Sequence, residues 1–112
     1  MSFEIITSDY FDTEAKALAK RYKSFKKDLI EFRKELEKAP LQGSEIAPNI
    51  RKIRMAIATK GRGKSGGARI ITYNALVTEQ EGKVYLLLIY DEADASSVKM
   101  NVVKQIVKEL IG

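Results

Sequence analysis

The chain has 112 residues, enough for one domain, and its 45% apolar and 31% charged residues are typical of a folded globular protein. It contains no cysteine and no histidine, which excludes disulfides, thiolate metal sites, serine–histidine–aspartate triads and histidine general bases. The net charge is +5, so any chemistry must use lysine, arginine, tyrosine or carboxylates.

The first part of the chain predicts a strand and two helices. The apolar run at residues 3–7 is typical of a first or edge strand. Two apolar stripes at helical spacing follow, and Ser8 and Ser24 stand where helix caps are expected. The stripes consist of Phe11, Ala15, Leu18 and Tyr22, and of Phe25, Leu29, Phe32 and Leu36. Residues 40–49, which contain Pro40, Gly43 and Pro48, are predicted as a loop after this helical hairpin.

The second part predicts three strands and a helix. The strands lie around residues 53–57, at residues 68–79 and at residues 83–91, and the last is apolar on both faces, as in a central strand. A glycine-rich loop, residues 60–67, and a turn at residues 80–82 connect them, so the strands should be mainly antiparallel.

An amphipathic C-terminal helix, from residue 96 onward, completes the prediction. Its stripe consists of Val98, Val102, Ile106 and Leu110. The expected fold is α+β with a mainly antiparallel four-stranded sheet and the order β-α-α-β-β-β-α.

Basic residues are concentrated in a segment without acidic residues. Residues 46–78 contain no Asp or Glu, and the cations in this stretch are Arg51, Lys52, Arg54, Lys60, Arg62, Lys64 and Arg69. A segment of one charge sign repels itself unless an anion compensates it, and phosphate is the commonest such partner. The basic block at residues 16–38 has interleaved acidic residues and is expected to be a solvated helix face. We therefore expect residues 51–69 to bind a polyanion.

The glycine-rich loop is a candidate phosphate contact, but it is not a Walker A loop. Gly63, Lys64 and Ser65 match the end of that motif, whereas Ala58 stands at its first glycine and a strand follows instead of a helix. The glycines alone would suit a flexible hairpin tip. The cations Lys60, Arg62 and Lys64 favour contacts with phosphate.

Turns centred in the glycine-rich loop and around residue 81 would bring four residues together at one end of the sheet: Arg54, Arg69, Tyr73 and Tyr90. The expected neighbours are Arg54 with Tyr73, Ala58 with Arg69, and Tyr90 with Thr72–Tyr73. Tyrosine can transfer a proton and arginine or lysine can stabilise a phosphorane, so such a group could cleave RNA through the ribose 2′-OH.

The candidate residues fall into two groups. The catalytic candidates are Arg54, Lys64, Arg69, Tyr73 and Tyr90, and the RNA-binding candidates are Arg51, Lys52, Lys60 and Arg62. Packing is the alternative role for Tyr73, and it is the favoured role for Tyr85. Tyr90 stands at a strand end, where site residues are common.

The stretch KIRMAIATKGRGKSGGARIITY, followed by VYLLLIYDE and an amphipathic helix, resembles the RelE/ParE superfamily of toxins from toxin–antitoxin systems, in particular its HigB-like branch. The motifs cover residues 52–91, and the element order covers the whole chain, which implies a single RelE-like domain over residues 1–112. The resemblance implies a ribosome-dependent endoribonuclease that cleaves mRNA in the ribosomal A site and is opposed by a small cognate antitoxin, with a higher-order toxin–antitoxin complex as one option.

The family's site residues fall on positions already singled out. They match Lys52 and Arg54 on the basic strand, Arg62 and Lys64 in the loop, Arg69 after the glycines, and the aromatic residues Tyr73 and Tyr90. The chain departs from this branch after Tyr90, where a lysine is frequent but the sequence reads Asp91-Glu92-Ala93-Asp94. We expect these acidic residues to repel a phosphate substrate and to alter local pKa values.

Two alternative functions remain, because the fold cannot choose among them: a ParE-like toxin directed at gyrase, and a non-catalytic nucleic-acid-binding protein. We expect no cofactor and no metal, since a chain without Cys and His offers only oxygen ligands. We expect an acidic antitoxin to bind residues 51–69. No apolar run approaches the roughly 20 residues of a membrane span, and the N-terminus lacks a signal-peptide pattern, so we expect a cytoplasmic protein without membrane contact.

Overall fold

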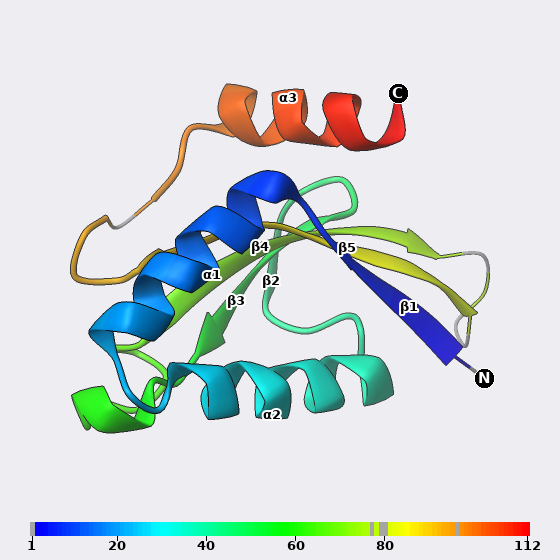
Figure 1. The fold of residues 1–112 in the computed structure, drawn as a ribbon. Helices are drawn as coiled ribbons and strands as arrows, with labels where there is room; N and C mark the ends of the chain where they lie inside the picture. Colours follow the sequence, from blue (N-terminus) through cyan, green and yellow to red (C-terminus); the bar gives the residue numbers. More distant parts are fainter. Residues whose placement is uncertain (1, 77, 79–80, 96) are drawn as a thin grey trace.

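The computed structural model describes residues 2–76, 78, 81–95 and 97–112 (Figure 1). Its elements are β1 (Ser2–Thr7), α1 (Asp9–Arg21), α2 (Phe25–Lys38), β2 (Ser44–Ala47), β3 (Ile50–Met55), the 3-10 turn η1 (Ala58–Lys60), β4 (Ala68–Leu76), β5 (Glu81–Asp91) and α3 (Met100–Ile111).

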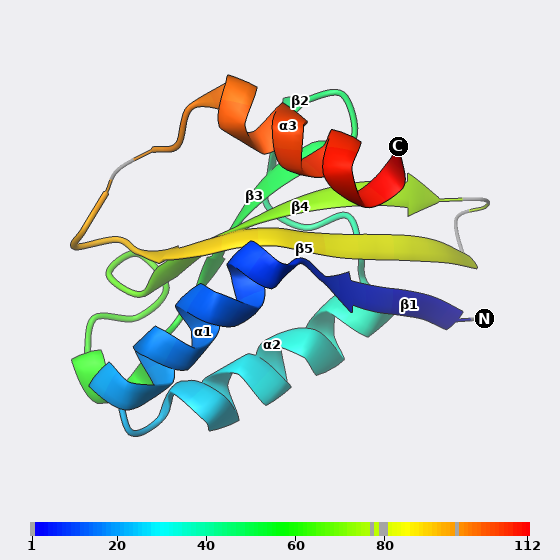
Figure 2. The ribbon, with the colours of Figure 1, turned by 45° about the horizontal axis from the view of Figure 1, so that its top comes forward.

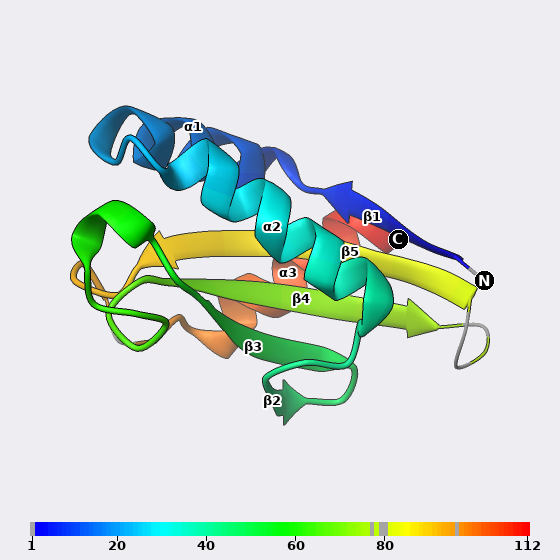
Figure 3. The ribbon, with the colours of Figure 1, turned by 90° about the horizontal axis from the view of Figure 1, so that it is seen from below.

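The predicted α+β class is confirmed, but the sheet differs from the prediction. In the described part of the chain it is five-stranded and mixed, with the order β1-β5-β4-β3-β2 (Figure 3). Strand β1 runs parallel to β5, and the other neighbours are antiparallel. The additional strand, β2, lies in the predicted loop at residues 40–49. It forms because Asn49, with a φ of 65°, allows a tight turn that pairs Ala47 with Ile50.

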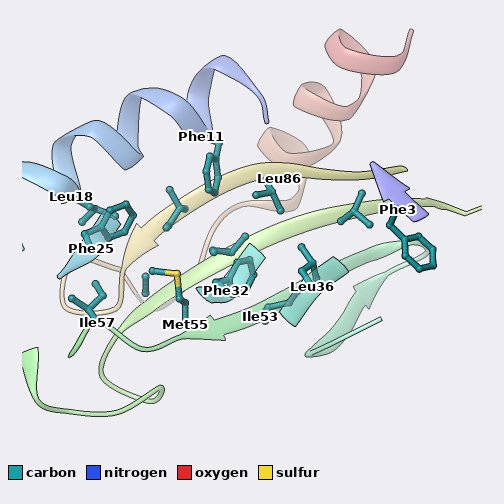
Figure 4. Packing of buried hydrophobic residues seen from close by; sticks show 14 residues of the cluster. Phe3, Phe11, Leu18, Phe25, Phe32, Leu36, Ile53, Met55, Ile57 and Leu86 are labelled. Atoms are coloured by element: carbon teal, nitrogen blue, oxygen red, sulfur yellow. The ribbon is translucent and has the colours of Figure 1, made fainter. Parts of the chain in front are cut away.

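The helical hairpin covers one face of the sheet and α3 covers the other (Figure 2). The two predicted apolar stripes of the hairpin face the sheet: Phe11 and Phe25 are each 1% exposed, while Ala15, Tyr22 and Leu29 are half-buried. Figure 4 shows these side chains packed against those of the strands, among them Ile53 and Leu86. Burial of each large apolar side chain contributes about 1.5–3 kcal/mol, so this face is the main source of stability.

The caps of the two hairpin helices differ. The Ser8 hydroxyl accepts a hydrogen bond from the Phe11 amide at 3.0 Å and so caps α1, as expected. Ser24 precedes α2 but makes no such bond, because its hydroxyl accepts from the amide of Thr59 in η1 at 3.0 Å and donates to Asp28.

Helix α3 packs most of the predicted stripe against the sheet, but not Val102: Ile106 is buried, and Val98 and Leu110 contact the same cluster. It begins at Met100 and buries Val103 and Ile106 against the sheet, whereas Val102 is 46% exposed. Val103 therefore takes the buried position that the prediction gave to Val102, and the predicted first residue of the helix, Ser96, lies outside the described residues.

Strand β5 begins two residues earlier than predicted. Strand β4 ends at Leu76, and residues 77 and 79 of the predicted strand lie outside the described residues. Of the predicted turn at residues 80–82, Gln80 lies outside them as well, while Glu81 and Gly82 already belong to β5.

A β-bulge in β5 determines which side chains face each helix layer. Ile71 pairs with Leu88 while Thr72 pairs with Leu86, so Leu87 is an extra residue in the ladder. Before the bulge the even-numbered side chains of β5 pack in the core under the hairpin, and after it the odd-numbered Ile89 does.

In the described part of the chain, no helix is long and apolar enough to cross a membrane.

Candidate functional site

The strand register brings three of the predicted catalytic residues into one row. Arg54 of β3 pairs directly with Arg69 of β4, and Arg69 pairs with Tyr90 of β5. All three side chains belong to the face of the sheet that α3 partly covers, because Ile71, two residues after Arg69, packs against that helix.

The predicted registers themselves are wrong. Arg54 faces Arg69 rather than Tyr73, because β3 ends at Met55 and η1 follows, so that the connection to β4 is long and its centre lies earlier than expected. Tyr90 faces Arg69 rather than Thr72–Tyr73, because Glu81 and Gly82 extend β5.

Tyr73 is not part of this row. It stands four residues along β4 from Arg69, about 13 Å away. Its strand partners are Ile50 and Tyr85, and its ring centroid lies 6.3 Å from that of Tyr85, at an interplanar angle of 52°. Both tyrosines pack in the apolar cluster under α3, and this position fits a packing role for Tyr73.

An open hollow of about 460 Å³ lies beside the row. It is lined by Ser44, Lys52, Arg54, Arg69 and Glu92. Lys64 lines an adjoining hollow that shares Lys52 and Arg54 with the first. Four cations from β3, the glycine-rich loop and β4 therefore surround one concave surface, which suits a polyanion.

Arg69 has a structural role as well as a position in the hollow. Its guanidinium donates hydrogen bonds to the carbonyl oxygens of Lys64 at 3.2 Å, Ser65 at 2.7 Å and Ala68 at 3.3 Å. The residue is 9% exposed. A guanidinium has five N–H donors, so two remain without a partner among the described residues and could bind an anion.

Two of the predicted RNA-binding residues point elsewhere. Lys60 is 10% exposed in its side chain and forms an ion pair with Asp91 at 2.6 Å, so it faces the interior and not a polyanion. Arg51 points to the loop after α2, where it donates to the carbonyl oxygen of Gly43 at 3.3 Å. Of the other two, Lys52 lines the hollow and Arg62 is exposed in the glycine-rich loop.

The acidic segment after Tyr90 does not present all its charge to the hollow. The Asp91 side chain is fully buried, and it accepts hydrogen bonds from Lys60 and from the Tyr22 hydroxyl at 2.5 Å and pairs with Arg21 at 3.1 Å. Arg21 also pairs with Asp94 at 2.8 Å. The expected repulsion of phosphate therefore comes from Glu92, which is exposed and lines the hollow, while the charges of Asp91 and Asp94 are compensated.

Burial and hydrogen bonding shift the pKa of the Asp91 carboxyl group in opposite directions. Burial raises its pKa, but the hydrogen bonds from Lys60, Tyr22 and the Ala93 amide outweigh burial and lower the pKa to about 2. The same bond to Asp91 raises the pKa of Tyr22, and burial adds to this shift. The sequence analysis did not predict this cluster. The acidic residue directly after Tyr90, at the end of a basic and apolar strand, was the signal that could have indicated it.

The Tyr90 hydroxyl is buried and has no hydrogen-bond partner among the described residues. A buried polar group without a partner is costly, so its presence calls for an explanation. Within the described ranges, no group of three or more Asp or Glu residues is arranged to hold a metal ion.

Comparison of the sequence with models of known protein families finds none that matches.

Proposed function

We propose that this protein is an endoribonuclease that cleaves mRNA through the ribose 2′-OH, as expected for the RelE-type toxins that its sequence resembles. The row of Arg54, Arg69 and Tyr90 beside a cationic hollow is the observation that carries this proposal. On three adjacent strands, two arginines that are candidates for phosphate binding stand next to a tyrosine that is a candidate for proton transfer.

Phosphate binding is assigned to the cations that line the hollow. Arg54 is exposed there, and Lys52 stands two residues earlier on the same face of β3. Arg69 adds the two guanidinium donors that its loop contacts leave over. A guanidinium group stays charged and can bind two phosphate oxygens at once, so it is suited to stabilising a phosphorane.

Proton transfer is assigned to Lys64 and Tyr90. Cleavage through the 2′-OH needs one group to accept a proton and one to protonate the leaving 5′-oxygen. Lys64 is exposed at the edge of the hollow. Tyr90 lies on β5 opposite Arg69 of β4, and its hydroxyl is buried, so RNA binding must expose the hydroxyl before it can transfer a proton.

A second candidate function is interaction without cleavage, either as a toxin directed at gyrase or as a nucleic-acid-binding protein. Two observations favour it: Arg69 already holds the glycine-rich loop, and the Tyr90 hydroxyl is inaccessible in this conformation. A nuclease and a nucleic-acid-binding protein would both bind a polyanion, so an assay of cleavage is needed to separate them.

The proposal includes a partner and a location. A toxin of this kind needs an antitoxin, and an acidic protein segment would complement the cations around the hollow. Its substrate on the ribosome places it in the cytoplasm. Calorimetry of the toxin with the product of a neighbouring short reading frame, repeated after reversal of Arg62 and Lys64 to Glu, tests the partner and its docking surface.

Primer extension on mRNA in a translating extract tests the function. The wild-type protein should produce cuts at codon positions, and Arg54→Ala should reduce their rate about 100- to 1,000-fold, the range for loss of one group that stabilises developing charge. Arg33→Ala, which removes an exposed arginine from α2, is the matched control and should cleave normally. Absence of cuts, or loss of DNA supercoiling without cuts, would exclude the nuclease and favour the second candidate.

A further inference from the structure

An ionic cluster around the buried Asp91 lies at the base of the glycine-rich loop and is not explained by the proposed chemistry. Asp91, at the end of β5, accepts from Lys60 Nζ at 2.6 Å and from the Ala93 amide at 3.0 Å through Oδ1. Through Oδ2 it accepts from the Tyr22 hydroxyl at 2.5 Å and contacts Arg21 at 3.1 Å. Its carboxylate thus joins the end of α1, the end of η1 and the turn after β5.

The cluster fixes the first residue of the glycine-rich loop. Lys60 is the last residue of η1, and Gly61 follows it with a left-handed φ of 68°. The Lys60 ammonium also lies 5.6 Å from the centroid of the Tyr22 ring, which gives it a second favourable contact. The chain then turns through residues 62–65 toward the hollow that Lys64 lines.

The far end of the loop is held separately. Arg69 binds the carbonyl oxygens of Lys64 and Ser65, and the Glu92 amide donates to the Gly67 carbonyl at 3.0 Å. In Figures 1 to 3 the end of α1, the glycine-rich loop and the end of β5 lie together at one end of the sheet. Both ends of the loop are therefore fastened to the end of β5 or to its neighbour β4.

We propose that Asp91 is a positioning residue, whose buried carboxylate holds Lys60 and thereby keeps the glycine-rich loop in the orientation that places Lys64 at the RNA-binding hollow. This inference rests on the proposed function for its RNA-binding consequence, while the anchoring of the loop stands on the contacts alone.

The sign of one effect separates positioning from simple electrostatics. Asp91→Asn removes a negative charge near a phosphate-binding surface, so electrostatics alone predicts tighter RNA binding. Loss of the anchor predicts weaker binding, because RNA must then order the loop and its cations at a cost in free energy. Asp94→Asn removes the same charge from an exposed ion pair with Arg21 and leaves Asp91 in place, so it is the matched control.

Two measurements on the full-length chain test the proposal. Hydrogen exchange followed by mass spectrometry reports the protection of residues 58–67 relative to β4 and β5. Fluorescence anisotropy with a labelled single-stranded RNA oligonucleotide reports affinity at a temperature where circular dichroism shows each variant to be folded. We expect Asp91→Asn to speed exchange selectively in residues 58–67 and to weaken binding about tenfold, the scale for ordering two long side chains. Asp94→Asn should match the wild type in exchange and bind RNA equally well or more tightly.

Lys60→Met is the second variant, in case Asp91→Asn does not fold. It keeps most of the aliphatic stem and leaves Asp91 with Arg21 and Tyr22, and it should speed exchange in the same residues. Unchanged loop exchange in the folded variants would overturn the anchor. Faster exchange with unchanged or tighter RNA binding by Asp91→Asn would overturn the positioning role. If the wild type does not bind RNA, the proposed function fails, while the exchange data still decide whether Asp91 anchors the loop.

Discussion

The stability contributed by the ionised Asp91 side chain should disappear in acid. Its carboxyl group is fully buried and has a pKa of about 2, against an ordinary value of 3.8. A carboxyl group whose pKa is lowered in the folded state stabilises that state above the unfolded pKa, and the stabilisation is lost as pH falls through the folded pKa. The relevant window is therefore about pH 4 to pH 2.

The magnitude follows from the two pKa values. Their difference, about 1.8 units, corresponds to about 2 kcal/mol of unfolding free energy at neutral pH. Asp91→Asn has no carboxyl group to titrate and leaves the Lys60 ammonium buried without its counter-charge. Loss of one partner of a buried ion pair costs about 3–5 kcal/mol, so the variant should be the less stable protein near neutrality.

Urea denaturation of both proteins at a series of pH values between about 6 and 2 tests this reasoning. The other carboxylates titrate in both proteins, so the difference in unfolding free energy between wild type and Asp91→Asn isolates Asp91. That difference should shrink by about 2 kcal/mol across the window. A difference that stays constant with pH would show that Asp91 has an ordinary pKa and that the cluster does not hold an ionised carboxylate.

Three further predictions concern the loop and the site. Reversal of Arg62 and Lys64 to Glu should weaken RNA binding and lower the slope of log affinity against log salt by about two, because each phosphate contact releases about one counterion. Gly67→Ala should destabilise the fold by about 3 kcal/mol in urea denaturation, because its Cβ would lie 2.0 Å from the Met55 carbonyl oxygen. Tyr90→Phe should lower the cleavage rate about 100-fold while stability stays equal or rises, since it removes a buried hydroxyl without a described partner.

Each of these has a matched control. Reversal of the exposed Lys26 and Lys27 on α2 should leave the salt slope unchanged; an equal change would move the binding surface to that helix. Gly61→Ala meets no atom within 4 Å but has a φ of +68°, so it should cost about 1 kcal/mol; a cost equal to that of Gly67→Ala would contradict the steric explanation. Tyr73→Phe should cleave normally, whereas normal cleavage by Tyr90→Phe would make Tyr90 a packing residue.

The elements with a strong local signal could be predicted from the sequence. The two stripes between Phe11 and Leu36 have helical spacing, the first with a cap at Ser8, and the structure packs both against the sheet as expected. The three successive strands of the second part are also present and antiparallel. Both signals depend on residues close together in the chain, where periodicity is informative.

The strand partners could not be predicted, because they depend on contacts between distant residues. Strand β3 ends early because Asp28 of α2 and Ser24, just before it, accept hydrogen bonds from the amides of Ala58 and Thr59, at 3.0 Å each, and hold these residues in η1. Because β3 ends early, the strand partner of Arg54 is Arg69 and not the predicted Tyr73. The sequence analysis placed Arg54, Arg69 and Tyr90 close together, but it did so through strand pairs that the structure does not contain.

The bulge at Leu87 has the largest consequence for the site. In a regular strand, alternate side chains face the same side, so a β5 without the bulge would place Asp91 on the face of Arg69 and Tyr90 in the core under the hairpin. One extra residue reverses both: Tyr90 joins the row of arginines, and Asp91 turns to Tyr22 and Lys60. The apolar run from Leu86 to Ile89 gives no sign of this, since Leu87 is buried in either arrangement. The same bulge that brings Tyr90 beside the arginines therefore also removes Asp91 from their face of the sheet, and Asp91 then holds the loop.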